Sequence, residues 1–286
     1  MEKAKKILYI AQELEPYVAA GDLSTTFREL IPAVQETGCE ARTFTPKWGS
    51  INERRNMLHE VIRLSGANLI IDGSDHQLII KVASIPPAHM QVYFIDNDDF
   101  MRGKLILCDK DGRYYRDNVE RSMFFCRGTI ETMKKLRWVP EIVHCTGWMG
   151  ALAPYLLKMA YYDEPCFRES RIVFTPCTTQ SLDQPMPRNL KNIIAYREAC
   201  LEALAPLGKL ETLNDLNRIG MFMADGIALT SENGHFMRMA KEMGKPIVVL
   251  DKEDLAKGLT DMYDNLWDEA VKKRPKKEEE DDDFLF

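Results

Sequence analysis

The stretch KILYIAQELEPYVAAGDLSTTFRELIPAVQETGCEARTFTP, residues 6–46, decides the fold. It begins with a short apolar run at 6–12 and ends with an extended run at 41–46. Between them, apolar residues recur three and four positions apart, which predicts an amphipathic helix: Leu23, Phe27, Leu30, Ile31 and Val34. Gly38 is expected to cap the C-terminal end of that helix. A strand–helix–strand unit at the start of the chain predicts a parallel sheet.

The same alternation continues along the chain. Further strands are expected at 90–98, 141–147, 171–177, 225–231 and 245–251, and helices near 189–205 and 212–222 among others. Residues 61–85 carry two extended runs around Asp72-Gly73-Ser74, which predicts a hairpin insert. We therefore expect the α/β class, with a doubly wound, mostly parallel sheet of about seven strands in a single Rossmann-like domain.

Composition excludes several classes of protein. The net charge of −6 argues against a protein that is dedicated to binding nucleic acid or an anionic membrane. None of the seven cysteines forms a CxxC pair, which favours a reduced, cytoplasmic setting without disulfides or a metal site. No apolar run is long enough to span a bilayer. No cofactor is indicated.

The C-terminal segment differs in character from the rest of the chain. We expect one domain at 1–273 and a disordered charged tail at 274–286, where a basic block adjoins six consecutive acids. The tail ends in an acidic-aromatic tip that could dock on a protein partner: Asp283, Phe284, Leu285 and Phe286. The alternative is a solubilising end without a partner.

Polar residues lie at the ends of the predicted strands or just after them, and His144 is expected to end one of these strands. The carboxyl ends of parallel strands meet at one edge of the sheet. These residues are the candidate substrate-binding positions: Glu13, Gly21, Asp22, Asp96, Asn97, Asp117, Asn118, Arg121, His144 and Trp148. Structural roles are the alternatives. Asp22 is expected first of all to cap the helix that begins at Leu23. Asp117 and Arg121 could pair at a helix start, and His144 and Trp148 could be core residues.

Several segments resemble bacterial glycogen synthases and plant starch synthases. The opening, ILYIAQELEPYVAAGDL, is similar to that family's strand, S-S-E, proline and K-x-G-G-L. The stretches VYFIDNDDF and YRDNVERSMFF are similar to V-Y-F-I-D-N and Y-x-D-N-x-x-R-F-x-F-F. PEIVHCTGWMGALAPYLLK is similar to P-D-I-(I/V)-H-x-H-D-W-x-x-G-L-x-P-x-Y-L-K. RIVFTPCTTQ and MADGIALTSE stand where the family has V-F-T-I-H-N and A-D-x-(V/I)-x-T-V-S, so the matches cover residues 6–232 in family order.

The resemblance implies one half of a GT-B glucosyltransferase. Such enzymes transfer glucose from ADP-glucose to an α-1,4-glucan in a cleft between two Rossmann-like domains. The chain departs from the pattern at Ala19, the family's lysine, and at Asp22, a family glycine. Gly147 replaces the aspartate of H-x-H-D-W, and Cys177 replaces the histidine of T-I-H-N. The second, nucleotide-sugar domain is expected to be missing.

Three functions remain open. The first is a degenerate glycogen/starch synthase domain that has no catalytic residues of its own, does not transfer glucose alone, and keeps a glucan or sugar pocket. The second is a glucosyltransferase completed by a separate C-terminal chain. The third is a non-enzymatic scaffold or regulator that acts through the tail.

Overall fold

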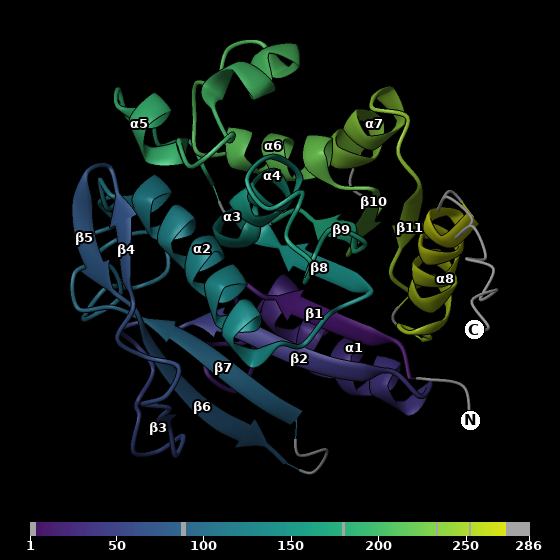
Figure 1. The fold of residues 1–286 in the computed structure, drawn as a ribbon, viewed down its shortest axis with the longest axis horizontal. Helices are drawn as coiled ribbons and strands as arrows, with labels where there is room; N and C mark the ends of the chain where they lie inside the picture. The colour runs from purple at the N-terminus through teal and green to yellow at the C-terminus, as the bar shows by residue number, and fades with distance from the viewer. Residues whose placement is uncertain (1–3, 87–89, 179–180, 233, 252, 273–286) are drawn as a thin grey trace, which may run out of the picture.

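The computed structural model describes residues 4–86, 90–178, 181–232, 234–251 and 253–272. Within them a nine-stranded sheet runs in the order β11-β10-β9-β8-β1-β2-β7-β6-β3 (Figure 1). These strands are β11 (Ile247–Val249), β10 (Gly226–Leu229), β9 (Arg171–Thr175), β8 (Ile142–Thr146), β1 (Lys6–Ile10), β2 (Glu40–Pro46), β7 (Met90–Asp96), β6 (Ile79–Ile85) and β3 (His59–Glu60). The strands from β11 to β7 are parallel, and β6 and β3 are antiparallel to their neighbours.

Helices cover both faces of the sheet (Figure 1). They are α1 (Asp22–Glu36), α2 (Asn118–Leu136), α3 (Gly147–Gly150), α4 (Leu152–Met159), α5 (Leu190–Ile194), the 3-10 helix η1 (Leu201–Leu207), α6 (Asp215–Met223), α7 (Gly234–Glu242) and α8 (Lys257–Lys272). Neighbouring residues of a strand point to opposite faces. Tyr9 of β1 meets Phe27 of α1, whereas Ile10 meets α3 at Gly150. Therefore α1 and α3 lie on opposite faces.

His144 joins the last helix to the middle of the sheet. It is fully buried, and its ring nitrogens lie 2.6 Å from the Tyr263 hydroxyl of α8 and 2.8 Å from the Thr175 hydroxyl of β9. The Tyr263 hydroxyl also donates to that of Tyr9, at 3.4 Å. Burial lowers the pKa of His144 to about 3, so the imidazole is neutral in the folded protein at neutral pH.

The predicted α/β class and the mostly parallel, doubly wound sheet are confirmed. The hairpin is confirmed as well: Ile71 of β4 (Asn68–Ile71) pairs with Ser74 of β5 (Ser74–Gln77). The two residues between them, Asp72 and Gly73, have φ values of 46° and 79°. Positive φ at both central positions is the requirement of a type I′ turn, and Asp-Gly satisfies it.

Three expectations need correction. The sheet is wider than about seven strands, because β6 and β3 extend it beyond β7. His144 does not end its strand, because β8 continues to Thr146 and pairs there with Thr175. The helix expected at 189–205 is two short helices, because the backbone is extended at Ala195 and Tyr196 exchanges hydrogen bonds with Ala199.

The predicted charged tail at 274–286, with its tip at 283–286, lies outside the described residues. Among the residues that the structure does describe, no helix has the length and apolar character needed to cross a membrane. In the same residues, no group of three or more His, Cys, Asp or Glu side chains is arranged to hold a metal ion.

The buried imidazole predicts a pH-dependent stability. Unfolding exposes His144, which then binds a proton near its ordinary pKa of 6.5 instead of near 3. The unfolded state therefore holds more protons in this window. The stabilisation is complete above pH 6.5 and is lost as the pH falls towards 3, by at most about 1.4 kcal/mol per pH unit. Urea denaturation at a series of pH values measures the slope.

The control for this prediction compares two histidines. His144→Gln is expected to reduce the slope between pH 6.5 and 4, whereas His59→Gln, at an exposed position, leaves it unchanged. Equal slopes for wild type and His144→Gln contradict the account.

Candidate functional site

Gln12 connects four segments at the carboxyl-end edge of the sheet. Its backbone N–H donates to Thr146 Oγ1 at 3.0 Å, and its carbonyl oxygen accepts from Trp48 Nε1 at 3.0 Å. Its side-chain oxygen accepts from the N–H of Met149 at 3.2 Å, and its amide nitrogen donates to Glu13 at 2.6 Å. Gln12 is fully buried, and each of these four polar groups has a protein partner, as burial requires.

Gly147 accommodates the Gln12 side chain. Gly147 begins α3 with φ of +65°, a left-handed conformation that favours glycine. A Cβ atom at this position would lie 2.2 Å from Gln12 Oε1 and 2.6 Å from its Cδ. The glutamine amide therefore fills the space into which any side chain at residue 147 would project. Gln12 and Gly147 fit one another as a pair.

Asp22 connects the start of α1 to the segments that follow two strands. Its Oδ2 atom accepts from Thr178 Oγ1 at 2.7 Å and from Thr230 Oγ1 at 2.6 Å. Thr178 follows β9, and Thr230 follows β10. The expected helix cap is wrong: Asp22 is the first residue of α1, Gly21 holds the N-cap position, and no side chain caps this helix end. The Thr178 and Thr230 hydroxyls donate to the carboxylate instead. The negative charge of Asp22 still lies in the first turn, where the helix dipole favours it.

Glu13 and Gly21 lie next to Asp22 at the start of α1. Glu13 is 8 % exposed, and one of its oxygens accepts from Gln12. Its other oxygen, Oε2, is 3.9 Å from the position of a Cβ at Gly21, so it faces the start of α1. The Ser24 hydroxyl fixes the same loop by donating to the carbonyl of Ala19 at 2.9 Å. Two carboxylates, Glu13 and Asp22, thus flank the N-terminal turn of α1.

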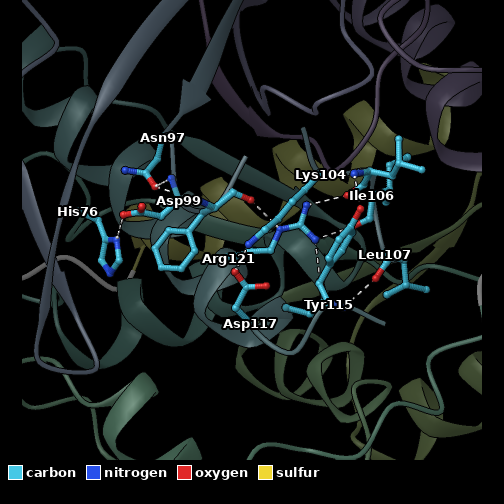
Figure 2. Close-up of polar contacts among 12 residues, drawn as sticks. His76, Asn97, Asp99, Lys104, Ile106, Leu107, Tyr115, Asp117 and Arg121 are labelled. Atoms are coloured by element: carbon cyan, nitrogen blue, oxygen red, sulfur yellow. Dashed lines mark hydrogen bonds and ion pairs between the residues drawn. The ribbon is translucent and has the colours of Figure 1, made fainter. Parts of the chain in front are cut away.

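Arg121 organises the loop between β7 and α2 (Figure 2). Its guanidinium donates to the carbonyl oxygens of Phe100, Leu105 and Ile106 at 2.8 to 3.0 Å and to Asn118 Oδ1 at 2.7 Å. It also lies 5.1 Å from the ring of Trp48. Arg121 is fully buried, and burial lowers its pKa to about 10. With every donor group directed at the protein, its role in this structure is to hold the loop.

The other candidates in this region have structural partners too. Asp117 forms an ion pair with Lys104, both labelled in Figure 2. Asn118 donates to the Leu107 carbonyl and to Gln184 Oε1. Asp96 pairs with Lys81 at 2.8 Å. Asn97 is 3 % exposed, and its side-chain oxygen accepts from the N–H groups of Asp99 and Phe100. Asp96 and Asn97 do lie at the carboxyl end of β7, as expected.

His144 and Trp148 are fully buried, with none of their side-chain surface exposed. The structure therefore brings Glu13, Gly21 and Asp22 together at the edge and places Asp117, Asn118 and Arg121 in a separate cluster. It adds three residues that sequence reasoning missed: Gln12, Thr178 and Thr230. Their positions within three residues of a strand end were a signal, but each has a partner that is more than 130 residues away along the chain.

Comparisons with known proteins identify relatives. The family model described as the starch synthase catalytic domain matches residues 6–235. The glycogen synthases of Pelodictyon phaeoclathratiforme and Chlorobium luteolum are each 34 % identical over 171 residues, which is 59 % of this chain and 35 % of theirs. The match thus spans about a third of the length of these curated relatives.

A solved structure supports the fold. The catalytic domain of starch synthase IV from Arabidopsis thaliana, bound to ADP and acarbose, superposes with a TM-score of 0.67 at 17 % identity. The superposition covers 86 % of this chain and 51 % of that one. At this identity the likeness concerns the fold alone.

The fit of Gln12 to Gly147 predicts non-additive stability. Gly147→Ala is expected to cost about 2–5 kcal/mol, because it adds a left-handed alanine and an overlap with the glutamine amide. In a Gln12→Ala background the same change is expected to cost only about 1–2 kcal/mol, since the two nearest atoms are gone. Urea denaturation of the four proteins gives the double-mutant cycle. An equal cost in both backgrounds contradicts the proposed fit.

Proposed function

The chain belongs to the starch synthase catalytic domain family, and on that premise we propose that it binds a glucan or small sugar at the carboxyl-end edge of its sheet without holding a nucleotide diphosphate there. The observation that carries this proposal is the Asp22 carboxylate, held by the Thr178 and Thr230 hydroxyls at the start of α1.

The start of a helix attracts anions, because its first N–H groups are unpaired and its dipole is positive there. In this chain the Asp22 carboxylate already lies in that turn, and Glu13 is beside it. A phosphate dianion entering the turn meets repulsion of about 1 kcal/mol per charge pair in water at 4 Å, and about 4 kcal/mol where the surroundings screen less. Ala19, at the family's lysine position, supplies no compensating charge.

A neutral sugar meets no such repulsion. Its hydroxyl groups can donate to Glu13 and Asp22, and carboxylates accept such hydrogen bonds well. Gln12 fills the space at Gly147, so a polar group that the family pattern carries at that position has no room here. The proposed activity is therefore recognition of a saccharide, and we do not expect these 286 residues to transfer glucose from ADP-glucose by themselves.

Ligand-dependent melting tests this proposal. A ligand that binds the native state raises the melting temperature, by several degrees at about a hundred times its Kd. Maltooligosaccharides are expected to raise it, and ADP and ADP-glucose are not. Asp22→Asn keeps the size of the side chain and removes its charge. This variant is expected to bind ADP about five- to tenfold more tightly than wild type.

Two outcomes contradict the proposal. One is a shift with ADP in wild type that equals the shift in Asp22→Asn. The other is the lack of a shift with any maltooligosaccharide. Turnover of ADP-glucose with a glycogen primer, by this chain alone, also contradicts it, whereas turnover only after a separate C-terminal chain is added supports the completed-transferase alternative. The scaffold alternative depends on residues 283–286, outside the described part of the chain.

A further inference from the structure

A basic pocket of about 700 Å³ lies at the opposite edge of the sheet. Five cationic side chains line it, from three separate segments: Arg42 of β2, Arg63 of the turn before β4, and Lys134, Lys135 and Arg137 at the C-terminal end of α2. Arg42 lies in the first half of β2, and Arg137 precedes β8. The pocket is thus at the amino-end edge of the parallel strands, away from Asp22.

The charges in this pocket are not balanced. Its one carboxylate, Glu131, is 3.3 Å from Lys134 and accepts from the Tyr161 hydroxyl through its other oxygen. Lys134 also pairs with Glu164 at 3.2 Å. Lys135 donates to the backbone carbonyl of Leu64, at 3.1 Å. In a chain with a net charge of −6, this local excess of cations is not a reflection of overall composition.

Arg42 stacks on a neighbouring tryptophan and leaves one of its nitrogens without an acceptor among the described residues. Its guanidinium lies 4.9 Å from the ring centre of Trp138, a stacking contact that favours arginine. The Trp138 ring is itself fixed, because its N–H donates to Glu40 at 2.7 Å. Arg42 Nη1 is buried and has no acceptor among the residues that the structure describes. A buried donor without an acceptor is costly, so an acceptor that reached this nitrogen would stabilise the arrangement.

Helix termini alone do not explain the pocket. Cations in the last turn of a helix offset its dipole, which accounts for Lys134 and Lys135. Arg42 and Arg63 come from other segments, and no acceptor contacts Arg63 within the described ranges of the chain. Three guanidinium groups therefore line one pocket. A single guanidinium can donate two parallel hydrogen bonds to two oxygens of the same phosphate.

We propose that this pocket binds a small molecule that carries two or more phosphate groups. The volume suits a metabolite, and the cations outnumber the one carboxylate, which is already paired. Its residues are separate from those of the proposed saccharide site. The failure of either proposal therefore leaves the other standing.

Calorimetric titration with inorganic pyrophosphate tests the proposal. Wild type is expected to bind it, with an affinity that falls as salt is added. Arg42→Gln and Arg63→Gln are each expected to weaken binding about tenfold, because each removes a charge-assisted contact. Arg42→Lys keeps the charge and loses the paired donors, so it is expected to weaken binding as well. Arg63 is exposed, so its variant tests binding without disturbing the core.

The matched control is Arg238→Gln, which makes the same charge change at an exposed position on α7. It is expected to change the affinity less than twofold. Three results overturn the proposal: no binding of pyrophosphate by wild type at millimolar concentration, equal weakening by Arg238→Gln and Arg63→Gln, or tighter binding of a hexaglutamate peptide than of pyrophosphate. The last result assigns the pocket to an acidic protein segment.

Discussion

The edge of the sheet depends on the hydrogen bonds of Gln12. This buried residue joins the end of β1 to β8, to Trp48 after β2 and to the start of α3. A buried amide must have all its partners, so the local backbone is fixed by these contacts. The glycine at 147 follows from the same constraint, because the glutamine occupies its side-chain space. One side chain thus fixes the local backbone and decides which residue position 147 can hold.

The two edges of the sheet differ in charge. At the carboxyl ends, Glu13 and Asp22 surround a helix start that would otherwise attract anions. At the amino ends, Arg42, Arg63 and Arg137 surround a hollow in which Glu131 is already paired. The family fold is kept. We propose that the preference for anions at the helix start is reversed, so that neutral ligands bind at one edge and phosphorylated ligands at the other.

The sequence predicted what depends on local patterns. Helical spacing located α1, and Asp72-Gly73 located the hairpin turn, since both signals lie within a few neighbouring residues. Contacts between distant segments were not predictable in this way. The partners of Asp22 are 156 and 208 residues away, so local reasoning offered a helix cap or a ligand contact for its carboxylate and not these two hydroxyls. The pocket around Arg42 could not be predicted from the sequence, because its cationic side chains come from three separate segments.

The central claim is that the carboxylates of Asp22 and Glu13, which flank the start of α1, keep a diphosphate from binding there. A crystal structure of the protein soaked with both ADP and a maltooligosaccharide tests it most directly. We predict that Asp22 keeps its hydrogen bonds to Thr178 and Thr230, that sugar hydroxyls contact Glu13, and that no diphosphate lies at this helix start. A diphosphate bound there, with Asp22 turned away from both threonines, would contradict the account.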